Sequence, residues 1–191
     1  MIDPAPHLFW ITSRAAGTAA LLLASVAVSI GLLMGGKLMR GRGPDLRAAH
    51  EAVSIATLVA IVVHAVTLLG DQFLNPGLAD ITVPFVSGYK TAWTTIGIVA
   101  GWSTIFLGLS FYARRWIGAR RWRSMHRFTV LAWALGVIHS LGEGSDAGEI
   151  WFLAMTAIVV VPALVLFFAR WGAGRASFAR TTPRSSPRPT T

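Results

Sequence analysis

The sequence predicts an all-α integral membrane protein, a bundle of five transmembrane helices. Of its 191 residues, 54% are hydrophobic and only 13% are charged, and the mean hydropathy is +0.60. Five apolar runs are long enough to cross a hydrocarbon core of about 30 Å, which takes about 20 helical residues. Residues 19–33 are apolar at nearly every position, which favours helices over the alternating pattern of a β-barrel strand.

The five predicted spans cover residues 14–38, 47–70, 91–113, 124–141 and 150–169. The first follows a short external segment and has no ionisable side chain between Arg14 and Lys37. Its N-terminal flank lacks a basic cluster and no A-x-A-like cleavage site precedes Lys37, so we expect the mature protein to keep it. The third span contains one GxxxG pair, and the fifth contains Pro162, a candidate kink.

The longest connection, residues 71–90, joins the second and third spans on the outer side. Pro76, Gly77 and Pro84 interrupt any continuous helix there, yet the segment is rich in apolar side chains. Two expectations stay open: the segment folds over the outer end of the bundle as a lid, or it lies in the membrane interface without such a role.

The basic residues indicate the orientation of the chain. Fifteen of the seventeen Lys and Arg fall within residues 37–47, 114–127 and 170–188. Five crossings place these segments on one side, which the positive-inside rule makes the cytoplasmic side, so the N-terminus is outside and the C-terminus inside. We divide the chain into a transmembrane domain, 1–170, and a basic, disordered cytoplasmic tail, 171–191.

Topology also accounts for the overall charge. The formal charge is +9 and the pI is 11.6, values that could indicate a nucleic-acid partner. Because the charges cluster at the inner ends of the predicted spans, we expect contact with membrane lipids and no nucleic acid. The predicted location is the plasma membrane, as a multi-pass protein of bacterial inner-membrane type.

Four histidines lie in the second and fourth spans, in two matched pairs. His50 and His64 are fourteen residues apart, and His126 and His139 are thirteen apart. Both spans run outward, so each carries an inner and an outer histidine about 20 Å apart at 1.5 Å per residue. Polar groups in hydrocarbon are costly, so these side chains need a partner. We predict that His50 pairs with His126 and His64 with His139, each pair ligating one haem iron.

The thirteen-residue spacing sets a condition on the fourth span. At 100° per residue it leaves an angular offset of about 140°, whereas fourteen residues return to within about 40° of the same face. The fourth span must therefore bend, change pitch, or present its two rings from different sides of one face.

The type of cofactor and its chemistry follow from what the chain lacks. The sequence has no cysteine, which excludes cysteine-ligated iron–sulfur clusters and the thioether attachment of c-type haem. Two b-type haems with both axial positions filled would leave no open site for substrate, so we expect electron transfer and no catalytic residue. Candidate partners for the inner haem propionates are Arg47, Arg123 and Arg127, with contact to lipid headgroups as the equal alternative.

These residues resemble the ferric reductase-like transmembrane domain family. The resemblance rests on the spacing of His50 and His64 and on Trp122-Arg123-Ser124-Met125-His126 through His139 to Gly144-Ser145-Asp146, with a weaker match at 84–93. The family includes the membrane parts of ferric reductases and NADPH oxidases and the haem subunit of the bacterial periplasmic methionine sulfoxide reductase. The resemblance covers roughly residues 15–170 and implies that the four histidines are axial ligands of two b haems. The family core commonly has six helices, whereas five are predicted here.

The electron donor and acceptor are expected to be separate molecules. Family enzymes often carry a cytoplasmic flavin and nicotinamide domain, but about twenty residues follow the last predicted span, and Gly172-Ala173-Gly174 lacks the strand and helix of a dinucleotide site. We therefore expect no flavin or nicotinamide site, a cytoplasmic flavin reductase or a quinol as donor, and ferric iron, dioxygen or a secreted reductase as external acceptor.

The sequence allows two other functions besides a cytochrome b that acts as an oxidoreductase component. One is a non-redox membrane scaffold whose histidines are structural, satisfied by hydrogen bonds inside the bundle. The other is metal-ion transport, which is disfavoured because Glu51 is the only acid in any predicted span.

Overall fold

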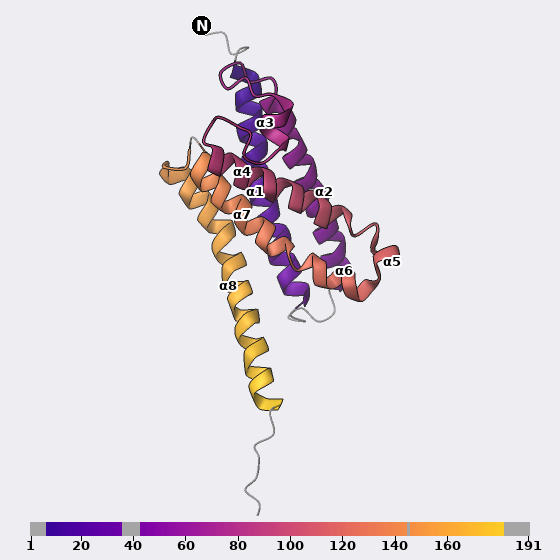
Figure 1. Ribbon diagram of the computed structural model, residues 1–191. Helices are drawn as coiled ribbons and strands as arrows, with labels where there is room; N and C mark the ends of the chain where they lie inside the picture. Colours follow the sequence, from indigo (N-terminus) through magenta and orange to yellow (C-terminus); the bar gives the residue numbers. More distant parts are fainter. Residues whose placement is uncertain (1–6, 36–42, 145, 182–191) are drawn as a thin grey trace, which may run out of the picture.

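A computed structural model describes residues 7–35, 43–144 and 146–181, with side chains as far as residue 172, and every regular element in them is a helix (Figure 1). In chain order these are α1 (Leu8–Gly35), α2 (Gly43–Leu68), α3 (Leu78–Thr82), α4 (Thr91–Leu109), α5 (Arg114–Ile117), α6 (Ala119–His126), α7 (Thr129–Glu143) and α8 (Ile150–Thr181). Four are long and apolar enough to cross a membrane: α1, α2, α4 and residues 150–172 of α8. The prediction of an all-helical chain is confirmed for the described residues, in which four helices rather than five are candidate membrane spans.

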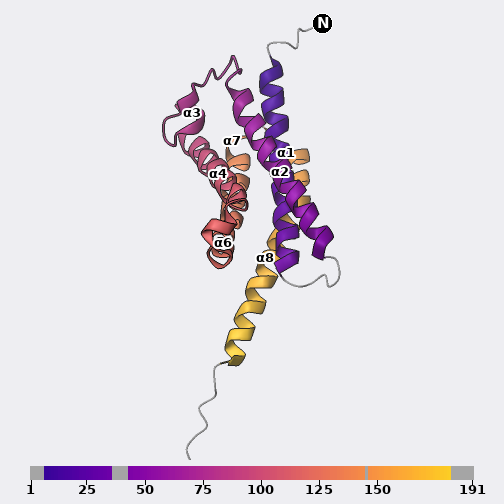
Figure 2. The same cartoon turned by 90° about the vertical axis from the view of Figure 1, so that its right-hand side faces the viewer.

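The helices form two layers. Figure 2 shows α1 and α2 side by side, with α4, α6 and α7 in a second layer beside them. The layers meet where the buried Trp133 of α7 donates its Nε1 hydrogen to Oγ of Ser25 on α1, over 2.9 Å. Ser25 and Ala27 on α1 and Ala132 on α7 are all buried, and such small residues let membrane helices approach closely.

The fourth predicted span, 124–141, is not one continuous helix. α6 ends at His126, residues 127–128 form a turn, and α7 begins at Thr129. The Thr129 hydroxyl donates to the carbonyl of His126 at 2.7 Å, and the N–H of Val130 bonds the carbonyl of Arg127 in place of His126. This side-chain competition for a main-chain carbonyl interrupts the helix. α7 alone has 15 residues, too few for a hydrocarbon core of about 30 Å.

The helix ends also differ from the predicted limits. α1 begins at Leu8 rather than at residue 14, since no glycine or proline interrupts the chain between Pro6 and Gly17. α2 begins at Gly43 and includes Pro44, whose missing N–H costs nothing in the first turn of a helix.

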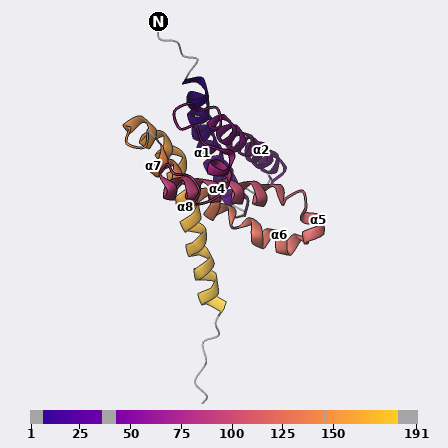
Figure 3. The same ribbon diagram turned by 45° about the horizontal axis from the view of Figure 1, so that its top comes forward.

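The prediction of a disordered tail over 171–191 is wrong for its first eleven residues. α8 continues to Thr181, because the apolar span runs directly into alanine and arginine, both good helix formers. Figure 3 shows this end of α8 extending away from the other helices. The remaining tail, residues 182–191, lies outside the described residues.

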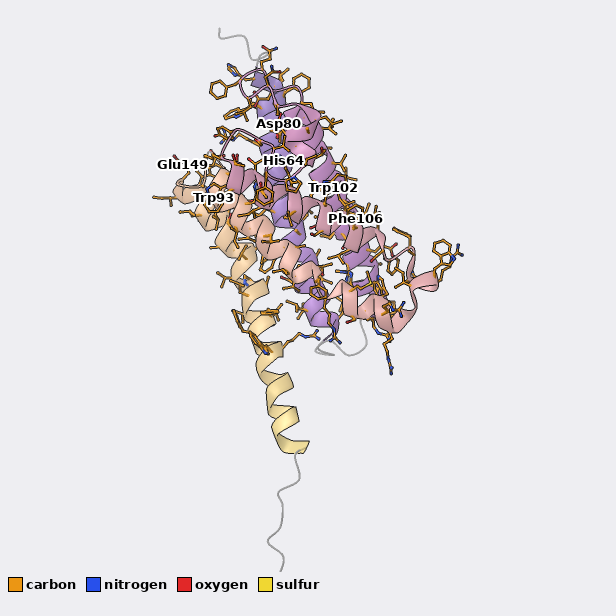
Figure 4. All side chains as sticks on the ribbon, viewed as in Figure 1. His64, Asp80, Trp93, Trp102, Phe106 and Glu149 are labelled. Carbon is orange, nitrogen blue, oxygen red and sulfur yellow. The ribbon has the colours of Figure 1, made fainter. Side chains whose placement is uncertain are left out.

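The outer connection packs against α4. Trp102 donates its Nε1 hydrogen to the carbonyl of Thr82 at 2.9 Å, and the N–H of Phe85 donates to Oγ1 of Thr95 at 2.9 Å. Figure 4 labels Trp102 and Phe106 on α4 and Asp80 on α3. Phe73 and Phe85 are 89% and 78% exposed, which favours a place in the membrane interface over a lid.

Candidate metal centres

The four histidines meet in the two predicted pairs. The ring centroids of His50 and His126 are 6.2 Å apart at an interplanar angle of 87°, and those of His64 and His139 are 6.5 Å apart at 66°. All four side chains are half-buried between the two layers. We call His50 and His126 the inner pair and His64 and His139 the outer pair.

The break between α6 and α7 makes these pairs possible. A continuous helix would turn His126 and His139 about 140° apart. Because the turn at residues 127–128 reorients the chain, both rings face α2, one from each helix. The sequence left three possibilities for the fourth span: a bend, a change of pitch, or two rings on different sides of one face. The structure shows a bend.

Main-chain carbonyls orient three of the four rings. Nδ1 lies 3.0 Å from the carbonyl of Ala27 for His50, 2.8 Å from that of Ser13 for His64 and 2.9 Å from that of Trp93 for His139. A carbonyl only accepts hydrogen bonds, so each Nδ1 carries the proton and donates it. The lone pair of each ring is then on Nε2, the arrangement that metal-ligating histidines adopt.

The fourth ring, His126, is held differently. Its Nδ1 is buried, and the main chain of Leu107 lies beside the ring. No hydrogen bond of good geometry joins them among the described residues, and the Leu107 carbonyl accepts the Ser110 hydroxyl at 2.6 Å. Instead, the indole of Trp122, one turn earlier on α6, stacks on the imidazole at 4.9 Å and 25°. Phe111 packs edge-on against Trp122, with centroids 5.7 Å apart.

The geometry of each pair fits a haem iron. A ring nitrogen lies about 2 Å from the metal it binds, and adding the radii of two rings gives about 6 Å between centroids. Nε2 of none of the four histidines forms a hydrogen bond within the part of the chain that the structure describes, which leaves each available as a ligand.

A bare metal ion fits these pairs less well. Among the described residues there is no group of three or more His, Cys, Asp or Glu side chains that could hold a metal. Zinc sites in proteins usually use three or four such ligands. A pair of imidazoles suits a metal that brings its other ligands with it, as haem iron does.

The three arginines predicted to hold haem propionates surround the inner pair in the sequence. Arg47 and Arg123 each lie three residues before a histidine of the inner pair, and Arg127 directly follows His126. All three are exposed, and none forms a hydrogen bond or ion pair with a described residue. Their role as propionate partners stays a prediction.

The cations at the outer end already have partners. Arg14 forms an ion pair with Asp146 and lies 4.2 Å from the ring centroid of Trp10. Lys90 donates to the carbonyls of Gly142 and Glu143, both at 3.3 Å. The outer pair therefore has less free positive charge in its vicinity than the inner pair.

Sequence reasoning missed the residues that orient the rings, namely Ser13, Ala27, Trp93 and Trp122. Ser13 lies in the short segment before the first predicted span, where no role in orienting a ligand is expected. One signal was available: Gly17 and Gly31 are fourteen residues apart, the same spacing as His50 and His64. Two antiparallel helices with equal spacing bring such positions opposite each other.

Comparison with known proteins identifies no relative of this chain. The chain matches no family model, no curated protein and no solved structure. The resemblance to the ferric reductase-like family stays a prediction from the histidine pattern, and the function has to be argued from the geometry of the two pairs.

Proposed function

We propose that this protein is a membrane b-type cytochrome that transfers electrons across the bilayer through two haems, one held by each histidine pair. The observation that supports this most is the geometry of the pairs. Each has centroids about 6 Å apart, as two ligands of one metal require, and in three of the four rings Nδ1 donates to a carbonyl while Nε2 stays free.

The chain's own residues limit the chemistry at these sites. A haem supplies one-electron oxidation and reduction of its iron. Because each pair would supply two histidine ligands to its iron, no site would be left for a substrate to bind the metal. One-electron transfer moves no proton and forms no bond to substrate, so neither pair would need a proton donor or a nucleophile from the protein.

The proposed topology has five crossings, with the N-terminus outside and the C-terminus in the cytoplasm. In this arrangement α6 and α7 together make the fourth crossing, since residues 119–143 form a longer path than α7 alone. The three basic segments then share the inner side, as the positive-inside rule requires. The inner pair lies near the cytoplasmic surface and the outer pair near the opposite one, in a bacterial plasma membrane.

Electrons would enter from a cytoplasmic flavoprotein or from a membrane quinol and leave to ferric iron, dioxygen or a secreted reductase outside. The exposed arginines Arg47, Arg123 and Arg127 suit haem propionates or an acidic donor at the inner end. Reduction of the purified protein by a menaquinol analogue alone would identify a quinol donor. Reduction only after adding a flavin reductase would identify the flavoprotein.

The rival from another class is a non-redox scaffold with structural histidines. The hydrogen bonds from Nδ1 to carbonyls are bonds that a structural histidine would also make. Such a protein, however, gains nothing from four half-buried histidine rings that meet in pairs with no hydrogen bond at any Nε2 among the described residues.

Haem content of the purified protein separates the two functions. We expect a reduced b-type spectrum with two haems per chain in the wild type and one in His64→Ala, which loses a ligand of the outer pair. The matched control is His7→Ala, because His7 is exposed at the N-terminal end and belongs to neither pair. A wild-type protein without haem, or a His64→Ala variant that keeps two, would overturn the proposed function.

A further inference from the structure

Glycines lie against the rings of three of the four histidines. A Cβ atom added at Gly97 would lie 2.5 Å from Nδ1 of His139, one at Gly17 would lie 3.0 Å from Nδ1 of His64, and one at Gly31 would lie 3.3 Å from Cε1 of His50. Carbon atoms in favourable contact are about 3.5–4.0 Å apart. Any side chain at these positions would therefore press on the histidine ring.

Each of these glycines has the same relation to the carbonyl that orients its ring. The carbonyl always lies four residues before the glycine, in the pairs Ser13 and Gly17, Ala27 and Gly31, and Trp93 and Gly97. In an α-helix the carbonyl of residue i bonds the N–H of residue i+4, so the side chain of i+4 stands beside that carbonyl. Glycine leaves the second lone pair of the oxygen open to a ring from the neighbouring helix.

On the basis of the proposed function, we infer that Gly17, Gly31 and Gly97 are positioning residues for the haem ligands. Each admits a histidine ring to a helix carbonyl, which fixes the ring orientation and directs Nε2 toward the haem iron. The cofactor-binding geometry is thus encoded on α1 and α4 as well as on the helices that carry the histidines.

The spacing along α1 supports this assignment. Ser13 and Ala27, like Gly17 and Gly31, are fourteen residues apart, and they face His64 and His50 of the antiparallel α2. Fourteen residues rise about 21 Å on either helix. α1 therefore repeats one carbonyl and glycine unit at each of the two levels.

α4 has the same unit only once. Trp93 and Gly97 serve His139, and the position fourteen residues after Trp93 is Leu107, close to the end of the helix at Leu109. Four residues further on stands Phe111 rather than a glycine. This is the side on which Nδ1 of His126 lacks a partner and Trp122 stacks instead. The main chain of Leu107 does lie beside His126, but its carbonyl accepts the Ser110 hydroxyl at 2.6 Å and no glycine stands four residues later, so the unit is incomplete there.

Another glycine of α4 provides a matched control. Gly101 is one turn from Gly97 on the same helix, but a Cβ atom there would lie 3.7 Å from Cγ2 of Ile61, an ordinary contact. Alanine is a better helix former than glycine, so Gly97→Ala and Gly101→Ala have the same favourable effect on the helix itself. They differ in the contact with the histidine ring.

The experiment compares haem content and the electron paramagnetic resonance signals of low-spin ferric haem in the purified protein. We expect Gly97→Ala to lose the outer haem, from two haems per chain to one. Gly17→Ala, in which the contact is longer, should keep two haems with a shifted signal for the outer one, and Gly31→Ala should shift the inner one. Gly101→Ala should keep both haems and both signals unchanged.

The inference is overturned if Gly97→Ala keeps the haem content and both signals of the wild type, or if Gly101→Ala changes them equally. If Gly97→Ala does not yield a folded, monodisperse protein, Gly31→Ala is the test instead. A shift of the resonance signal confined to the inner haem supports the inference, and an unchanged signal overturns it. A wild type without haem would overturn the proposed function itself. A wild type with two haems and unaffected glycine variants would overturn only the positioning role.

Discussion

The outer and inner histidine pairs use the same residue type at the same separation but are held by different means. At the outer pair, both rings donate to main-chain carbonyls, of Ser13 and Trp93. At the inner pair, only His50 does so, while His126 is held by stacking on Trp122. The carbonyl contacts depend on a glycine that admits the ring to the main chain, whereas the contact at His126 depends on the side chain of Trp122.

The difference extends to the electrostatics of the two sites. A hydrogen bond from Nδ1 to a carbonyl makes the imidazole a stronger electron donor, which favours the oxidised metal. The outer pair has two such bonds and the inner pair one. The exposed arginines near the inner pair favour the reduced state there. If each pair holds a haem as proposed, both effects predict the lower midpoint potential for the outer one.

The largest effects are expected from removing one ligand of each pair. His126→Ala should lose the inner haem and His139→Ala the outer one, leaving one of two haems in each variant. In sealed, right-side-out vesicles, a membrane-impermeant reductant added outside should rapidly reduce the haem that remains in His126→Ala but not the one in His139→Ala. The opposite pattern would show that the depths of the pairs are reversed.

Single-haem variants also test the difference in midpoint potential. We expect the outer haem, measured in His126→Ala, to titrate lower than the inner haem, measured in His139→Ala, by on the order of tens of millivolts, because hydrogen bonds and local charge tune haem potentials. Potentiometric titration followed by absorption gives both values. Equal potentials, or a higher one for the outer haem, would contradict the proposed effect of the hydrogen bonds.

A smaller effect is expected from removing the aromatic support of the inner pair. Trp122→Ala loses the stacking on His126, worth about 1 kcal/mol beyond the area it buries. The expected result is a weaker and spectrally altered inner haem with the outer haem unchanged, measured by haem content and paramagnetic resonance. Trp116→Ala is the control, since Trp116 is 74% exposed and contacts neither pair. Equal changes in both haems would mean that Trp122 stabilises the bundle rather than His126.

Exchanging serine and alanine between positions 13 and 27 compares the two places where α1 contacts a histidine ring. Ser13 also donates its hydroxyl to the carbonyl of His64 at 3.1 Å, whereas the equivalent inner position is Ala27. Ser13→Ala should cost about 1 kcal/mol, the net value of one hydrogen bond, and broaden the outer haem signal. Ala27→Ser should leave the outer signal unchanged and alter only the inner one. Thermal unfolding and paramagnetic resonance of both variants provide the measurement.

The smallest effect is expected at the exposed arginines. If Arg123 contacts an inner propionate, Arg123→Gln should change the midpoint potential of the inner haem by an amount equivalent to about 0.2–1 kcal/mol, and this change should shrink at high salt. Arg115→Gln is the control, because Arg115 stacks 4.2 Å from the ring centroid of Trp116 instead. The absence of any change would leave lipid headgroups as the partners of Arg123.

Much of the candidate site could be predicted because depth in a helix follows directly from residue number. The two spacings differ by only one residue, so the histidines of the two spans could be paired by depth. The same spacing predicted that the fourth span bends, changes pitch or presents its two rings from different sides of one face. The location of the bend could not be predicted. It depends on the Thr129 hydroxyl taking the carbonyl of His126, and a threonine at that position is equally compatible with an unbroken helix.

The sequence by itself determined that the chain forms apolar helices. It also determined which four histidines lie at two matched depths in two of the predicted spans, and which of them can meet. These properties depend on side-chain polarity and on the constant rise of the helix. Only the tertiary structure decided which carbonyls of α1 and α4 receive the rings. Every residue has the same main-chain carbonyl, so its availability depends on how two helices are rotated against each other, and the packing of small residues sets that rotation.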